Sequence, residues 1–147
     1  MYILRRKISE YTDRHQLLGV FRTQVNAEEA KQVYCRQLQS GEISDPWEKQ
    51  AYHKVDLEKD LVVEANLRTT GSILEAGQVS VISSYAEGFG QIVRKFEAIC
   101  ETPHDAENIA REIEAADNGN FPFYCEVDRM IVGDLTYGQL NWNPYKK

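Results

Sequence analysis

The feature that most constrains the fold of this chain is an internal repeat. Residues 18–30 (LGVFRTQVNAEEA) align with residues 97–109 (EAICETPHDAENI), and residues 51–57 (AYHKVDL) align with residues 123–129 (FYCEVDR). The matched positions include Thr23 with Thr102, Ala27 with Ala106, Glu28 with Glu107, Tyr52 with Tyr124 and Asp56 with Asp128. Repeated units are short supersecondary structures that bury their apolar faces against each other. The sequence therefore predicts two copies, residues 1–68 and 78–147, joined by a connector at residues 69–77.

Each copy carries the same order of structural signals: two strands, a helix, a strand and a weaker strand. Runs rich in Val, Ile, Phe and Tyr, bounded by glycine and polar residues, predict the strands. The predicted strands are residues 2–8, 16–23, 50–57 and 61–67 in the first copy, and 78–85, 91–101, 121–128 and 130–140 in the second. Alternation within residues 92–100 is partial and places Phe96, Ala98 and Cys100 on one face; the other face carries Val93, Lys95, Glu97 and Ile99.

The two predicted helices are amphipathic and about four turns long. The first begins with Asn26 as its N-cap and ends before Gly41; the second has Thr102 as its N-cap and Pro103 in its first turn. Apolar residues at helical spacing predict one buried stripe on each helix. These stripes are Ala27, Ala30, Val33, Tyr34 and Leu38, and then Ala106, Ile109, Ala110, Ile113 and Ala116.

One copy of about 70 residues would bury little apolar surface. Two copies that share a sheet, with both helices on one face, form a single-domain two-layer α+β sandwich with a mostly antiparallel sheet. This arrangement is ferredoxin-like with extra strands. Shifting the frame by one strand gives an alternative that resembles the vicinal-oxygen-chelate proteins, whose two modules enclose a metal site. In that frame His15, Glu64, Glu97 and Glu126 are conceivable ligands, but only their residue type selects them, so we predict no metal and no cofactor.

Composition and charge narrow the range of functions. The chain has 147 residues, of which 42% are hydrophobic and 27% charged, and this mixture excludes disordered and fibrous proteins. No apolar run is long enough to span a membrane, and the first charged residues follow the apolar ones, unlike in a secretory signal. The net charge is −6, most of it from the second copy, and no basic stripe is present. We therefore expect a cytoplasmic protein that binds neither nucleic acid nor membranes.

Catalytic motifs are missing from the sequence. The three cysteines are far apart and form no Cys-x-x-Cys pair, and we expect each to be a buried, reduced thiol. No Walker motif, Gly-x-Ser-x-Gly elbow or helical histidine pair is present. The aligned strands do place His53 and Cys125 at equivalent positions, which would suit an activated thiol if the two side chains met. These observations favour a non-enzymatic protein.

The candidate binding residues are aromatic and acidic. Tyr52, Asp56, Tyr124 and Asp128 oppose the valines on their strands, so they would line the open face of the sheet or form cross-strand pairs there. Trp47 and Trp142 lie in loop-like segments, as does Gly88-Phe89-Gly90, which is predicted to be a turn. We interpret the chain as an interaction module that engages a protein partner, as an inhibitor or immunity protein does, or that self-associates as a homodimer. The alternative is a small-molecule-binding protein or metal-dependent enzyme with a pocket between the copies.

Overall fold

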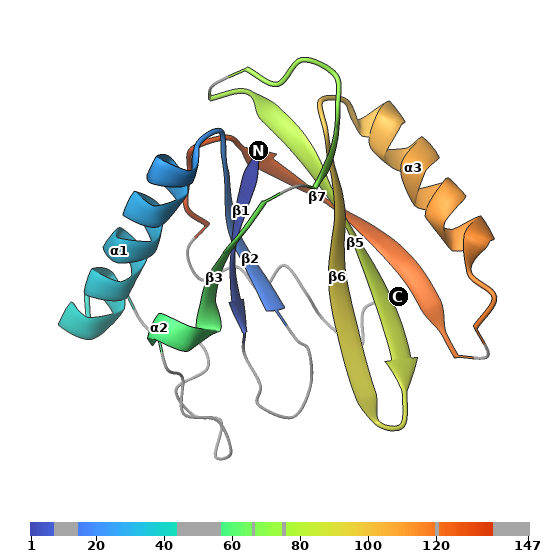
Figure 1. Ribbon diagram of the computed structural model, residues 1–147, viewed down its shortest axis with the longest axis horizontal. Coiled ribbons are helices and arrows are strands. Elements are labelled where there is room, and N and C mark those ends of the chain that lie inside the picture. The colour runs from blue at the N-terminus through green and yellow to red at the C-terminus, as the bar shows by residue number, and fades with distance from the viewer. Residues whose placement is uncertain (8–14, 44–56, 66, 75, 120, 137–147) are drawn as a thin grey trace.

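A computed structural model describes most of the chain (Figure 1). The described residues are 1–7, 15–43, 57–65, 67–74, 76–119 and 121–136. The predicted strand at residues 50–57 lies outside them except for its last residue, Leu57. The candidate residues Trp47, Tyr52, His53, Asp56 and Trp142 also lie outside the described residues. Within the described part of the chain, no helix has both the length and the apolar character needed to cross a membrane.

The first sheet is antiparallel and has the strand order β2-β1-β3. Its strands are β1 (Tyr2–Lys7), β2 (His15–Phe21) and β3 (Leu61–Glu64). Helix α1 (Gln24–Ser40) follows β2, and the short helix α2 (Leu57–Asp60) leads directly into β3. The central strand is therefore the first strand of the chain, flanked by the strand before α1 and the strand after it.

The second sheet has the strand order β4-β6-β5-β7. Its strands are β4 (Arg68–Thr70), β5 (Gln78–Gly88), β6 (Gln91–Cys100) and β7 (Phe123–Ile131), with helix α3 (Pro103–Ala116) between β6 and β7. The pairs that β5 forms with β6 and β7 are antiparallel, and the short β4 pairs with β6 in parallel. Strands β6, β5 and β7 are arranged as β2, β1 and β3 are in the first sheet; the repeat itself stays a prediction.

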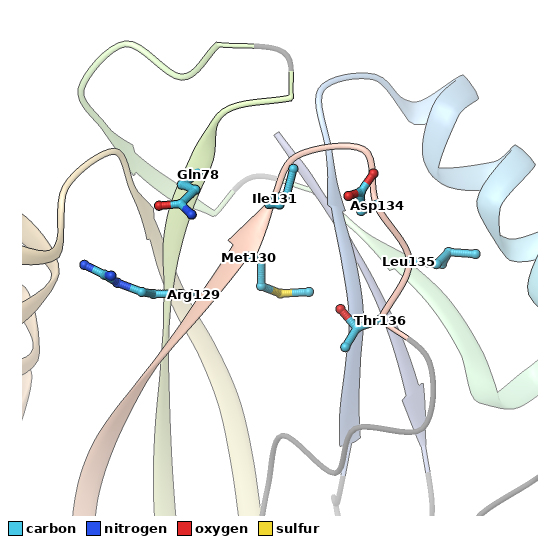
Figure 2. Close-up of a pocket in the computed structure, with 7 residues that line it drawn as sticks. All are labelled: Gln78, Arg129, Met130, Ile131, Asp134, Leu135 and Thr136. Atoms are coloured by element: carbon cyan, nitrogen blue, oxygen red, sulfur yellow. The ribbon is translucent and has the colours of Figure 1, made fainter.

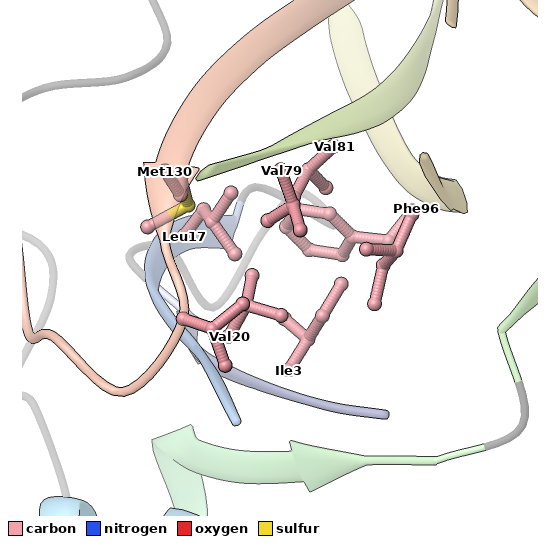
Figure 3. Packing of buried hydrophobic residues seen from close by; sticks show 9 residues of the cluster. Ile3, Leu17, Val20, Val79, Val81, Phe96 and Met130 are labelled. Carbon is pink, nitrogen blue, oxygen red and sulfur yellow. The ribbon is translucent and has the colours of Figure 1, made fainter. Parts of the chain in front are cut away.

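The two sheets pack face to face, and each helix covers the outer face of its own sheet (Figure 1). Between the sheets lies a core of buried apolar side chains contributed by both of them (Figure 3): Ile3, Leu17, Val20, Val79, Val81, Phe96, Ile99, Met130 and Val132. The α+β class of the prediction is confirmed. The expectation that both helices lie on one face of a shared sheet is wrong, because the inner faces of the sheets are apolar and cover each other.

The helices lie close to their predicted positions and bury most of the predicted stripes, although Ala116 at the end of the second stripe is exposed. Thr102 caps α3 as predicted, accepting a hydrogen bond from the backbone N–H of Asp105 at 3.2 Å. The predicted cap of the first helix is wrong: Thr23 is the N-cap of α1 and accepts from the N–H of Asn26 at 3.1 Å. The N-cap therefore lies three residues earlier than predicted, at Thr23, which is the residue that aligns with Thr102.

Two strand predictions need correction. The register of β5 and β6 shifts between Ile82 and Ser83, so one extra residue of β6 bulges out. As a result Phe96 points into the core between the sheets, whereas Ala98 and Cys100 pack against α3.

Strand β7 continues without a break through residue 131, although the sequence suggests separate strands at 121–128 and 130–140. Strand β4 occupies the start of the segment predicted as a connector.

Candidate functional site

Tyr124 and Asp128, the described members of the predicted binding set, share the face of β7 that lies opposite α3. Met130 on the same face belongs to the core between the sheets, and Cys125 on the other face packs with α3. Tyr124 stacks on Tyr85 of the neighbouring strand, with ring centroids 5.1 Å apart and planes inclined by 14°. The assignment of these residues to one face agrees with the structure, but their contacts are internal cross-strand contacts.

Asp128 forms an ion pair with Arg94, a buried arginine of β6. The Arg94 Nη2 donates to Asp128 Oδ2 at 2.9 Å, its Nε donates to Ser83 Oγ at 3.1 Å, and its Nη1 donates to the backbone oxygen of His15 at 3.0 Å. The guanidinium also lies over the ring of Phe96, 4.7 Å from its centroid. Burial lowers the pKa of Arg94, opposed by the negative charge of Asp128. These hydrogen bonds connect β6 to β7 and to the first sheet. Arg94 and Asp128 therefore have a structural role.

The conceivable metal ligands of the alternative frame do not assemble. Arg5 lies between two of them: its Nη1 is 2.8 Å from His15 Nδ1, and its Nε is 2.9 Å from a Glu64 carboxylate oxygen. Glu97 is on the other face of the second sheet, where it accepts from Ser84 Oγ at 2.7 Å. No group of three or more His, Cys, Asp or Glu side chains suited to a metal ion occurs among the described residues. The guanidinium between His15 and Glu64 already provides the positive charge there.

The three thiols are free, and two of them, Cys35 and Cys125, are poorly suited to nucleophilic chemistry. Burial, with the nearby carboxylates of Glu114 and Glu97, raises the pKa of Cys125 to about 12. Burial also raises the pKa of Cys35 above its ordinary value. Since the thiolate is the reactive form, both groups are almost entirely protonated near neutral pH. His53, the residue considered as a partner for Cys125, lies outside the described residues.

The strongest unexplained feature is an aromatic tip formed by Phe89 and Phe121. Phe89 occupies the two-residue turn between β5 and β6 and has a φ of +52°, followed by Gly90 at +74°. Its side chain is 93% exposed, and that of Phe121 is 48% exposed. The two rings touch, with centroids 5.1 Å apart. A bulky residue in the left-handed region is uncommon, and in this turn glycine, asparagine and aspartate are the usual residues.

An apolar groove continues from the aromatic tip along the outer face of the second sheet. It has a volume of about 420 Å³ and lies between this face and the last turn of α3. Its lining residues are Ser84, Ala86, Val93, Lys95, Glu97, Ile113, Ala116, Asp117 and Phe123. Phe123, Ala86 and Val93 lie side by side on β7, β5 and β6.

The aromatic tip and the groove share one face. Gly88 points to the same side as Ala86, and a Cβ atom on Gly88 would lie 3.1 Å from the ring of Phe121. The ring of Phe121 therefore covers Gly88 on the face that carries the groove. Together the aromatic tip and the groove form one continuous surface, which we call the tip surface.

A second hollow of about 420 Å³ lies where the chain leaves β7 (Figure 2). It is lined by Gln78, Arg129, Met130, Ile131, Asp134, Leu135 and Thr136. The residues after β7 cross to the first sheet, where the N–H of Gly133 donates to Val20 O at 2.8 Å and that of Thr136 to Leu18 O at 2.7 Å. Arg129 and Asp134 point away from each other (Figure 2). The polar groups of this hollow do not converge as those of an active site do.

Sequence analysis found part of the tip surface. The sequence predicts Gly88-Phe89-Gly90 as an aromatic turn and Ile113 as part of a buried helical stripe, but it points to no binding role for Phe121, Phe123 or Val93. The available signal was the short distance along the chain between Phe121 and Phe123, which alternation places on one face. Comparison of the chain with models of protein families, with curated proteins and with solved structures gives no match.

Proposed function

We propose that this chain is a non-enzymatic interaction module that binds a protein partner through the tip surface. The observation that supports this most directly is Phe89, which is almost fully exposed in a left-handed conformation. The cost of that conformation for a residue other than glycine is about 1 kcal/mol or more. Asparagine would reduce the cost without exposing an aromatic ring. The tilted contact with the ring of Phe121 offsets part of this cost, but it leaves Phe89 almost fully exposed.

Aromatic side chains of this kind are typical anchors of protein interfaces. Burying apolar surface contributes about 25 cal/mol per Å², and exposed aromatic rings clustered next to an apolar groove offer a compact area for burial. The rival reading, an enzyme with a pocket between the two halves, would need ionisable groups that converge on a ligand. Arg94, Asp128, Arg5 and Glu64 lie in that region, but they bind one another. We place the module in the cytoplasm, where free thiols stay reduced.

The experiment is site-specific photo-crosslinking in the cells that make the protein. Benzoylphenylalanine replaces Phe89 in one variant and Val25, an exposed residue of α1 on the opposite side of the molecule, in the control variant. We expect the variant with the crosslinker at position 89 to form one abundant adduct with another protein. The variant with the crosslinker at position 25 should form no adduct of the same mass. When the crosslinking is repeated in a lysate of these cells, excess purified wild-type chain should suppress the adduct, whereas excess Phe89→Asn should not.

The Phe89→Asn variant separates loss of binding from loss of folding. Asparagine adopts positive φ readily, so the turn should form at least as well and the thermal midpoint should stay equal or rise. Equal adducts from positions 89 and 25, or competition by Phe89→Asn as strong as by the wild type, would show that the tip surface is not the interface. If position 89 crosslinks only to a second copy of this chain, the partner is the chain itself and the tip surface is a homodimer interface.

A further inference from the structure

The charges around the groove indicate what kind of segment can occupy it. Two carboxylates, Glu97 and Asp117, line the groove. Lys95, the one basic group among the described lining residues, lies 3.7 Å from a Glu97 carboxylate oxygen and offsets that charge, so the charge of Asp117 stays unbalanced. The rim is therefore negative, although the floor is apolar.

Helix α3 adds to this negative potential at its C-terminus. The last turn of α3 contains no basic residue, and it contains Glu114 and ends at Asp117. The carbonyl end of a helix carries partial negative charge, so carboxylates there repel the helix dipole and cost stability. A cation beside Asp117 would offset both effects.

A second copy of this chain is a poor occupant of the groove. Two tip surfaces that met face to face would bring Glu97 and Asp117 of one copy close to those of the other, and each copy carries a net charge of −6. Like charges that are brought together in an interface cost binding energy. The complementary occupant is positively charged.

We infer that the groove binds a segment of the partner in which an apolar side chain is flanked by lysine or arginine. This inference depends on the proposed function and specifies the chemistry of the partner. The apolar side chain would lie over Val93, Ile113 and Phe123, the most apolar part of the groove. The flanking cations would lie next to Asp117 and Glu97. The aromatic tip, at the turn between β5 and β6, would cover the same segment from that end of the groove.

The test uses three fluorescently labelled peptides and the full chain. The basic apolar probe is KKLKKLKK, the acidic probe is EELEELEE, and the basic polar probe is KKSKKSKK. Binding is followed by fluorescence anisotropy at 50 mM and 300 mM NaCl. We expect the basic apolar probe to bind, the acidic probe not to bind, and the basic polar probe to bind at least about tenfold more weakly because it lacks the apolar contact. Higher salt should weaken binding, since it screens exposed charges.

Two charge variants show where the probe binds. Asp117→Asn keeps the oxygen that accepts from the N–H of Gly119 and removes one rim charge, so the dissociation constant should rise about threefold to tenfold. Glu28→Gln removes the same charge from the half-buried Glu28 of α1, far from the groove, and should leave the constant within about twofold. Equal binding of the acidic and basic apolar probes, or equal effects of both variants, would overturn the inference.

The outcome is distinguishable from failure of the proposed function. If Phe89 crosslinks to a partner but Asp117→Asn changes neither that adduct nor the probe affinity, the tip surface is an interface and the inferred basic segment is wrong. If the position-89 adduct is no stronger than the one from position 25, the proposed function fails first. Binding of the basic apolar probe that Asp117→Asn weakens supports the inference directly.

Discussion

Cys125 shows how its surroundings set the chemistry of one side chain. It lies on the face of β7 that packs against α3, and its backbone N–H donates to a Glu114 carboxylate oxygen at 2.8 Å. Burial is the largest cause of its raised pKa, and the charges of Glu114 and Glu97 add to it. An anionic sulfur there would lose solvation and lie close to two negative groups. The side chain therefore behaves as a small apolar group.

We predict that Cys125 resists alkylation in the folded protein. A shift of its pKa from 9.0 to about 12 lowers the thiolate fraction at pH 8 by at least about a hundredfold. In a Cys35→Ser variant, iodoacetamide at pH 8 should modify Cys125 only in urea, as measured by mass spectrometry of the peptides. Rapid modification without urea would contradict the prediction. Because the folded pKa exceeds the unfolded one, the stabilising contribution of this thiol is complete below about pH 9 and is lost as pH rises towards 12.

At the scale of elements, the helices were the most predictable part of the fold. Their apolar residues recur at the spacing of a helical turn, whatever the helix packs against. The structure accordingly buries Ala27, Ala30 and Tyr34 on α1, and Ala106 and Ile109 on α3. The strands were less predictable because one extra residue in β6 reverses which side chains face the helix. Nothing in the alternation of residues 91–100 marks that bulge, since it follows from the pairing with β5.

The start of α1 gives a test that separates the structure from the sequence-based expectation. We predict that Thr23→Ala lowers the free energy of unfolding by about 1 kcal/mol, because the Thr23 Oγ1 accepts from the N–H of Asn26. Asn26→Ala should be neutral or slightly stabilising, because Asn26 is an exposed residue inside the first turn, where alanine is the better helix former. Urea unfolding of both variants measures the difference. A larger loss for Asn26→Ala would restore Asn26 as the cap.

At the scale of the whole molecule, the packing of one sheet on the other could not be predicted from the sequence. The repeat suggested two sheet-and-helix units but not which faces meet, and an apolar face can be covered by a sheet or by a helix. Arg94 illustrates the difficulty. In the sequence it is one of many charged residues, and its burial follows only from the joint placement of β2, β6 and β7. The tip surface likewise depends on where α3 ends over the second sheet.

The ion pair of Arg94 and Asp128 should therefore contribute far more to stability than an ion pair on the surface. Asp128→Ala would leave a guanidinium whose side chain is only 1% exposed without its carboxylate, and we expect it to lower the free energy of unfolding by about 3 kcal/mol. Glu112→Ala removes the carboxylate of an exposed ion pair with Arg68 at 3.6 Å and should cost less than about 1 kcal/mol.

Urea unfolding, followed by far-ultraviolet circular dichroism, compares the two variants with the wild type. The double variant Arg94→Met with Asp128→Leu should recover much of the loss, since it removes the buried charge together with its partner. That recovery would show that the penalty of Asp128→Ala comes from the uncompensated arginine between the sheets. If Asp128→Ala and Glu112→Ala cost the same, Arg94 remains hydrated, and the sheets do not close over it as the hydrogen bond to His15 requires.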